Sequence, residues 1–157
     1  MQRAAVADLD VHQGDGTASI FSDDPDVYTL SIHGEKNFPL RKQVSRRDVG
    51  LADGTGDDEY LEIVARELPA LFEFRPEIVF FQAGVDGLST DRLGRLRLTR
   101  KGLLARDRPV LETCAARNVP VVITIRPCKR MRTPSARRRP SRCKYLFAEY
   151  YARIGID

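Results

Sequence analysis

Residues 4–16 have the sequence Ala-Ala-Val-Ala-Asp-Leu-Asp-Val-His-Gln-Gly-Asp-Gly. The apolar first half predicts a strand over residues 4–9, and the glycine-rich second half predicts a turn directly after it. Side chains two positions apart on a strand point to the same face, so we expect Asp8, Asp10 and His12 to lie together. Ligands of open α/β sheets bind at the carboxyl ends of the strands, which is where these three side chains stand.

Three more short apolar runs, at residues 27–32, 78–83 and 119–125, are rich in β-branched or aromatic side chains and predict further strands. Several of the runs are almost continuously apolar, as is typical of parallel strands that are covered on both faces. Helical patterns separate the strands along the chain. The sequence therefore predicts an α/β fold in which an open parallel sheet has flanking helices.

Two helices are predicted from apolar residues that recur every three or four positions. Asp57 is expected to cap the first helix and Thr99 the second, because their side-chain oxygens can bind the free amides of a first turn. Pro69 and Pro109 lie inside these patterns and are expected to kink both helices. Residues 33–56 contain several glycines and predict a long connection without secondary structure, a kind of segment that usually has a function.

The positive charge of the chain is concentrated in one segment. The whole sequence has 26 Lys and Arg against 22 Asp and Glu, which gives a net charge of +4 and a pI of about 9.1. Nine of the basic side chains and none of the acidic ones lie in residues 126–144. We expect this basic segment to be irregular and residues 145–157 to form a short C-terminal helix. Nucleic acid is therefore not the expected partner, although a non-enzymatic binding module that uses the basic segment is an alternative function.

Composition excludes several classes of protein. No apolar run reaches the roughly 20 residues that a membrane helix needs, and acidic residues follow the start too closely for a secretory signal. The three cysteines are an odd number without C-x-x-C spacing, so neither a disulfide framework nor a zinc ribbon is predicted. These features favour a cytoplasmic protein with no membrane association. The only histidines, His12 and His33, leave few options for histidine-based catalysis.

The residues that carry chemistry follow two of the predicted strands. Asp86 comes shortly after the strand at 78–83, just as Asp10 and His12 come after the first strand. Carboxylate oxygens and an imidazole nitrogen suit a divalent metal such as a catalytic zinc ion with one open position. An Asp-x-Asp pair after an apolar run is also typical of phosphatases of the haloacid dehalogenase type, whose pattern has a threonine where this chain has His12. Spacing alone leads to a divalent metal site and no further.

Six ordered blocks of the sequence resemble the histone deacetylase family, above all its bacterial deacetylase-like and acetoin-utilisation members and the related class IV branch. The first block is D-L-D-V-H-Q-G-D-G-T-A at residues 8–18, and the others lie at residues 28–39, 53–61, 82–86, 91–94 and 102–107. The resemblance implies a partial arginase/deacetylase-type sheet, with residues 1–125 as the C-terminal part of a deacetylase-like catalytic domain. It also implies a zinc-dependent hydrolase that cleaves N-acetyl-lysine or a small acetylated amine.

The resemblance further implies roles for individual residues. The positions that match are Asp10, His12 and Asp86 for the zinc ligands, Asp8 with the backbone carbonyls around Ser31 and Ile32 for a monovalent cation such as K⁺, and Phe38 for an aromatic wall of the acyl channel. Zinc in such a site polarises the amide carbonyl and lowers the pKa of a bound water. Asp8 would support the zinc ligands without binding the zinc ion itself.

Two departures from the family pattern bear on activity. The family has a pair of histidines, its general base and acid, upstream of the Asp-x-Asp-x-His stretch, and neither His12 nor His33 replaces them. We expect His33 to be a structural, hydrogen-bonded side chain. After its last strand the family has a glycine-rich loop with a tyrosine that stabilises the transition state, whereas residues 126–132 contain neither residue type. Positioned proton transfer contributes roughly 10²–10⁴-fold, so we expect the chain alone to be nearly inactive.

The same departures predict how the chain arose. We expect a reading frame that is truncated on its 5′ side and shifted near Ile125. A further alternative is a half-domain that acts together with a separately encoded N-terminal part, which would supply the missing histidine pair.

Overall fold

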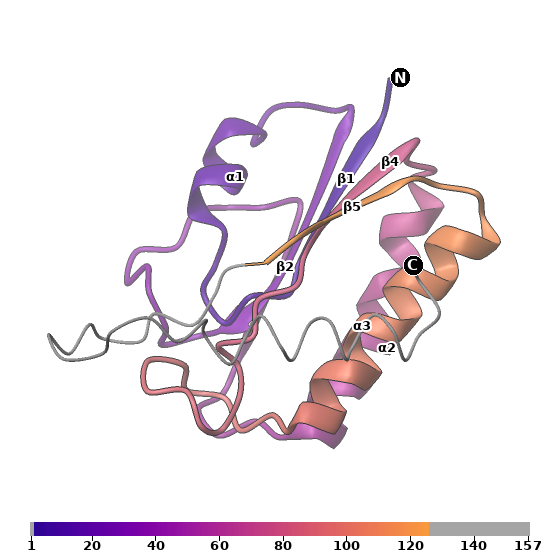
Figure 1. The fold of residues 1–157 in the computed structure, drawn as a ribbon. Coiled ribbons are helices and arrows are strands. Elements are labelled where there is room, and N and C mark those ends of the chain that lie inside the picture. The colour runs from indigo at the N-terminus through magenta and orange to yellow at the C-terminus, as the bar shows by residue number, and fades with distance from the viewer. Residues whose placement is uncertain (1, 126–157) are drawn as a thin grey trace, which may run out of the picture. The chain divides into compact units, whose positions relative to one another are not determined.

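Five parallel strands form a single sheet in the computed structural model, which describes residues 2–125 (Figure 1). From one edge to the other the strands are β3 (Arg47–Leu51), β2 (Val27–Gly34), β1 (Ala4–Asp8), β4 (Ile78–Gln82) and β5 (Val121–Thr124). All neighbouring pairs are parallel. The four strands expected from the sequence are present, and the predicted α/β class with an open parallel sheet is confirmed.

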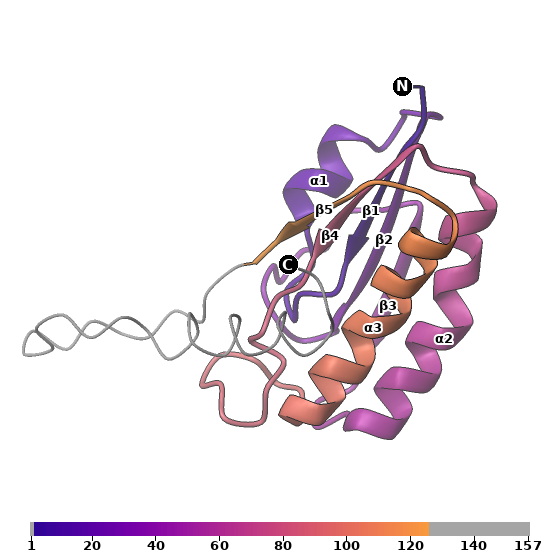
Figure 2. The same cartoon turned by 45° about the vertical axis from the view of Figure 1, so that its right-hand side comes forward.

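In the part of the chain that the structure describes, both faces of the sheet are flanked by helices (Figures 1 and 2). The helices are α1 (Asp15–Ile20), α2 (Asp57–Glu73) and α3 (Arg100–Ala116). In both views α2 and α3 lie side by side against one face, while α1 lies on the opposite side of the sheet. Because consecutive parallel strands need a crossover connection, α2 and α3 return the chain from the end of one strand to the start of the next.

The main core lies between the sheet and the pair α2 and α3. Ala5 and Ala7 of β1 are fully buried, as are their pairing neighbours Val79 and Phe81 of β4. On the other face, Phe80 stays 39% exposed. The sequence predicted that several strands are covered on both faces. This holds for β2, where residues 29–34 are all buried, but not for β4, where the six-residue α1 leaves Phe80 exposed.

One strand and one helix were not expected. The stretch predicted to lack secondary structure, residues 33–56, contains β3, which pairs with β2 from Leu30 opposite Arg47 to Gly34 opposite Leu51. The strand is short, lies at the edge and contains charged residues and a glycine, so it has little β pattern of its own. Helix α1 has only six residues, too few for a helical repeat to be recognised.

The predicted caps are half right. Thr99 caps α3, since its Oγ1 accepts a hydrogen bond from the amide of Gly102 at 3.0 Å. The cap of α2 is Gly56, not Asp57, which is the first residue of the helix. The Asp57 carboxylate instead accepts hydrogen bonds from the amide and hydroxyl of Thr99, at 2.8 and 2.5 Å. Asp57 therefore ties the start of α2 to the start of α3.

The two prolines do not divide their helices. Pro69 lies within α2 and Pro109 within α3, and each helix continues as one 17-residue element. In α3 the hydroxyl of Thr113 donates to the carbonyl of Pro109 at 2.6 Å. Packing of α2 and α3 on the sheet and on each other compensates for the backbone hydrogen bond that each proline removes.

Some predictions fall on residues that the structure does not describe. The basic segment at 126–144 and the helix at 145–157 lie outside the described residues, as do Cys128 and Cys143. Among the helices of residues 2–125, none combines the length and the apolar character needed to cross a membrane.

Candidate metal centre

Two successive turns follow β1 and hold its acidic side chains. The strand ends at Asp8, so Asp10 and His12 do not continue it as the sequence analysis assumed. The Asp8 carboxylate accepts a hydrogen bond from the amide of Asp10 at 3.1 Å, and the Asp10 carboxylate accepts one from the amide of His12 at 2.9 Å. In each turn a side chain binds the backbone two residues ahead, which is typical of aspartate in loops. The side chains of Asp8, Asp10 and His12 are therefore placed by hydrogen bonds between residues two positions apart, and not by the alternation of side chains along a strand.

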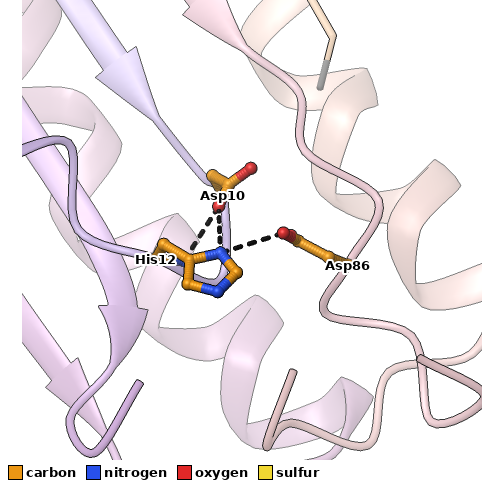
Figure 3. A group of neighbouring side chains, drawn as sticks. All are labelled: Asp10, His12 and Asp86. Carbon is orange, nitrogen blue, oxygen red and sulfur yellow. Dashed lines mark hydrogen bonds and ion pairs between the residues drawn. The ribbon is translucent and has the colours of Figure 1, made fainter. Parts of the chain in front are cut away.

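The structure brings Asp10, His12 and Asp86 together (Figure 3). His12 Nδ1 lies 3.0 Å from Asp10 Oδ1 and 3.0 Å from Asp86 Oδ2. One ligand atom from each of the three residues lies within 4.8 Å of the others. Asp10 and His12 come from the loop after β1 and Asp86 from the loop after β4, and these strands are neighbours in the sheet. We call these three residues the Asp-His-Asp cluster.

The electrostatics of the cluster favour a bound cation. Asp10 and Asp86 are buried, at 4% and 7% exposure. Hydrogen bonds from His12 first to Asp10 and then to Asp86 raise the pKa of His12 to about 9, since a positive ring is stabilised between two carboxylates. In the described structure, Asp10 Oδ2 is buried and has no hydrogen-bond partner. A buried carboxylate oxygen without a partner is costly, and coordination to a metal ion removes that cost, so these residues fit a metal.

A cavity of about 610 Å³ opens beside Asp10 and His12 on the α1 side of the sheet. Its wall includes Phe21, after the end of α1, and Phe80 of β4, so a polar end at the cluster continues into an apolar surface. Phe38, which the sequence assigned to a channel wall, does not line this cavity. Phe38 is 67% exposed in the loop after β2.

Asp8 lies next to the cluster but does not belong to it. It is 8% exposed and stands opposite Ser31 in the register of β1 and β2. Burial raises the pKa of Asp8 to about 7, with the nearby carboxylate of Asp10 acting in the same direction. Ser31 and Ile32 are both buried in β2. The hydroxyl of Ser31 is hydrogen-bonded to His33 Nδ1 at 3.0 Å.

His33 is a structural residue, as expected. Its side chain is 2% exposed and contacts Ser31 in the interior of β2. Burial lowers the pKa of His33, so the ring is neutral at physiological pH. It is not one of the three clustered residues.

Two glycines near the cluster are required by close packing. A Cβ atom on Gly84 would overlap the carboxylate and Cα of Asp10, and one on Gly94 would overlap the backbone carbonyl of Asp86. Any other residue at these positions would displace a ligand loop. The sequence alone gives no reason for either glycine, because the overlap exists only where two separate loops meet.

Sequence reasoning also missed Arg106 of α3. It is 1% exposed, and its Nη1 donates hydrogen bonds to the carbonyls of Leu9 and Gly84, at 3.0 and 2.8 Å. These carbonyls belong to the two loops that carry the cluster. The signal in the sequence was an arginine in the middle of a helical pattern, which without the fold looks like a solvent-exposed charge.

Several known proteins are similar to this chain in sequence. A family model described as the histone deacetylase domain matches residues 1–126. An uncharacterized protein of Picosynechococcus is 53% identical over 125 residues, which are 79% of this chain and 42% of that protein. Histone deacetylase 2 of Arabidopsis thaliana is 34% identical over 127 residues, covering 78% of this chain and 33% of its own length.

A histone deacetylase-like amidohydrolase of Pseudomonas aeruginosa is 34% identical over 110 residues, which are 62% of this chain and 29% of that protein. The chain therefore spans less than half of the length of each of these relatives.

Proposed function

The chain belongs to the histone deacetylase family, and from this premise we propose that its Asp-His-Asp cluster binds a zinc ion that serves the hydrolysis of N-acetyl amides. The family is generally metal-dependent and acts on acetylated substrates. The observation that carries the proposal is the convergence of Asp10, His12 and Asp86, whose ligand atoms lie within 4.8 Å of one another.

The donor set favours zinc. Two carboxylates and one imidazole are three protein ligands, and catalytic zinc sites typically have three with a fourth position left open. When bound, zinc polarises an amide carbonyl and makes a coordinated water acidic. Calcium and magnesium prefer more oxygen ligands than this cluster offers, so the nitrogen of His12 argues against them.

The protein residues around the cluster orient each ligand. The amide of Val11 donates to Asp86 Oδ1 at 3.2 Å, which leaves Oδ2 directed at His12. The amide of His12 donates to Asp10 Oδ1, which fixes the orientation of this carboxylate beside the His12 ring. Because these bonds exist without metal, the ligands need little rearrangement when the ion binds.

The other assigned residues have supporting roles in the proposal. Asp8, with the backbone carbonyls around Ser31 and Ile32, forms a K⁺ site next to the zinc. Phe38 presents an exposed aromatic ring to the acyl chain of the substrate. The substrate is N-acetyl-lysine or a small acetylated amine, in keeping with the amidohydrolase named among the relatives.

Proton transfer is the weak step of this chain. It has two histidines; His12 is assigned to the metal, and His33 is buried and hydrogen-bonded to Ser31. General acid–base catalysis is worth roughly 10²–10⁴-fold, so the chain alone binds metal but hydrolyses amides slowly. We propose that this chain by itself is a catalytically impaired form of a deacetylase.

Metal analysis and an amidase assay together test the proposal. We expect about one zinc ion per chain after dialysis against buffered zinc, and little hydrolysis of an acetyl-lysine substrate. For activity, residues 2–125 replace the matched region of the Picosynechococcus relative, and the chimera is compared with the unmodified relative. We expect the chimera to be active and its Asp86→Asn variant to be inactive. A chain that takes up no zinc in proportion to protein rules out the metal centre.

A further inference from the structure

Arg106 is the largest side chain in the described structure that is completely buried. It lies in the first half of α3, on the face that packs against the sheet, and is 1% exposed. A buried guanidinium loses its hydration, and it is tolerated only when hydrogen bonds replace the lost water. The partners of Arg106 therefore show what this charge does in the fold.

Two backbone carbonyls that accept hydrogen bonds from Arg106 belong to the two loops that carry the Asp-His-Asp cluster. Nη1 donates to the carbonyl oxygen of Leu9, which is the residue between Asp8 and Asp10, at 3.0 Å. The same nitrogen donates to the carbonyl oxygen of Gly84, two residues before Asp86, at 2.8 Å. A single nitrogen of α3 thus bridges the loop after β1 and the loop after β4.

A carboxylate holds the guanidinium in place. Nε of Arg106 donates to Oδ1 of the adjacent Asp107 at 2.6 Å, and Asp107 is itself 5% exposed. The planar guanidinium has donors in fixed directions, so fixing Nε also fixes the direction in which Nη1 points. The pair is neutral overall, which reduces the cost of burying it.

The two loops meet closely at this point. Gly84 packs against the backbone of Asp10 so tightly that a Cβ atom would overlap it. The amide of Val11 crosses to the carboxylate of Asp86 at 3.2 Å. Arg106 reaches the loops from the α2 and α3 side, whereas the cavity beside Asp10 and His12 opens on the α1 side. The guanidinium therefore does not enter this cavity.

We propose that Arg106 is a positioning residue for the metal centre, which sets the separation between Asp86 and the pair Asp10 and His12 through the carbonyls of Leu9 and Gly84. As a statement about metal affinity, the inference rests on the proposed function. As a statement about the geometry of the two loops, it stands without metal. Changes to groups that orient metal ligands typically reduce metal affinity by roughly 10–100-fold.

The following variants distinguish positioning of the ligand loops from a general contribution of Arg106 to the stability of the fold. Arg106→Met combined with Asp107→Asn removes the donors and leaves no unpaired buried charge, and Asp107→Asn alone is its reference. Arg106→Lys restores the charge and some donors but not the planar geometry. Val110→Ala is the matched control, because Val110 is a fully buried residue of the same helix that has no polar side-chain atom.

Two measurements on the full chain test the role of Arg106. The dissociation constant for Co²⁺, followed by its visible absorption, is expected to rise about 10–100-fold in the double variant and less in Arg106→Lys. Hydrogen exchange without metal is expected to become faster in the loops at residues 9–12 and 84–86. In Val110→Ala we expect a lower melting temperature with a dissociation constant within about threefold of the parent.

Each outcome decides one of the two proposals. If the double variant has the Co²⁺ affinity, absorption spectrum and loop exchange of the Asp107→Asn reference, Arg106 has no positioning role. If the parent chain binds no Co²⁺, the metal centre is wrong, and loop exchange then decides whether Arg106 holds the loops. If the double variant does not fold, Arg106→Lys takes its place, and parent-like affinity and exchange in that variant overturn the inference.

Discussion

Two sites with buried carboxylates, one at Glu67 and the other at the Asp-His-Asp cluster, differ in how their charge is balanced. Glu67 of α2 is 6% exposed and binds two arginines. Arg47 donates to it through two nitrogens at 2.6 and 2.7 Å, and Arg66 donates at 2.9 Å. In the Asp-His-Asp cluster, two buried carboxylates share one imidazole, and an oxygen of Asp10 has no partner in the described structure.

The contrast separates a structural cluster from a binding site. The Arg47 side chain beside Glu67 holds the pKa of that carboxyl below its ordinary value, and its hydrogen bonds tie β3 to α2. At the Asp-His-Asp cluster the two carboxylates instead raise the pKa of His12 to about 9, so that one positive ring is shared between two negative side chains. A protein that buries acids without their counter-ions gives up stability, and a bound ion can restore it.

The largest expected effect is on metal binding, and it comes from replacing Asp86 by Asn. The amide oxygen can still accept the hydrogen bond from Val11, while the negative charge needed by a cation is gone. We expect the dissociation constant for zinc to rise more than about 100-fold. Without metal, the free energy of unfolding should change by less than about 1 kcal/mol, because loss of the ion pair with His12 is offset by removal of the repulsion between Asp86 and Asp8.

Isothermal titration with zinc and urea unfolding measure these two quantities. Asp53→Asn is the control, since Asp53 is an acid of a surface ion pair with Arg95. Equal zinc affinity in the Asp86 and Asp53 variants would place the metal elsewhere.

Gly84→Ala is expected to damage both the site and the fold. The added methyl group overlaps Asp10, including its backbone, so one of the two loops has to move. Overpacking of this kind costs about 1–3 kcal/mol. Zinc affinity should fall with stability, as measured by titration and thermal unfolding. Gly16→Ala is the matched control, because a Cβ atom at Gly16 in α1 meets nothing within 4 Å and should leave both quantities nearly unchanged or slightly improved.

Glu67→Gln is expected to affect stability alone. It weakens the bonds to Arg47 and Arg66, both of whose side chains are about half exposed or more, so the loss should be about 1 kcal/mol or less. Zinc affinity should stay at the parent value, because the cluster lies at the ends of other strands. Glu62→Gln, an exposed position on the same helix, is the reference in urea unfolding. A parallel loss of zinc affinity would mean that the two clusters are coupled.

The smallest expected effect is the pH dependence of the stability that Glu67→Gln loses. The pKa of Glu67 is lower in the folded chain than its ordinary value of 4.5, so the folded state holds fewer protons on this group than the unfolded state. The stabilisation is therefore complete above about pH 4.5 and disappears as the pH falls through the lower, folded value. The difference in unfolding free energy between the parent and Glu67→Gln should shrink towards zero on acidification. A difference that grows instead would contradict the ion-pair explanation.

Recognition of the site from sequence worked for a reason that was partly wrong. The pattern of Asp8, Asp10 and His12 was assigned to one strand face, but the strand ends at Asp8 and turns hold the next two side chains. The prediction of their convergence with Asp86 held because both loops begin at the carboxyl ends of neighbouring strands. The prediction of a metal site rested on the chemical type of these residues, whereas the local geometry assumed for them was wrong.

The edge of the sheet was the weakest part of the prediction. β3 owes its structure to pairing with β2 and to the bond between Arg47 and Glu67. None of these partners is near it in sequence. The six-residue α1 is equally dependent on what surrounds it. Short elements of this kind gain too little from their own residues to be visible in a periodic pattern.

The sequence by itself determined the four main strands, the two long helices and the residue types at the candidate metal centre, because apolar periodicity and donor chemistry are local properties. Only the tertiary structure decided the edge strand, the need for Gly84 and Gly94, and the burial of Arg106 against Leu9 and Gly84. Each of these depends on backbone atoms from separate segments meeting within hydrogen-bond or contact distance. Such meetings follow from the packing of α3 and the ligand loops on the sheet, which no single segment of the chain encodes.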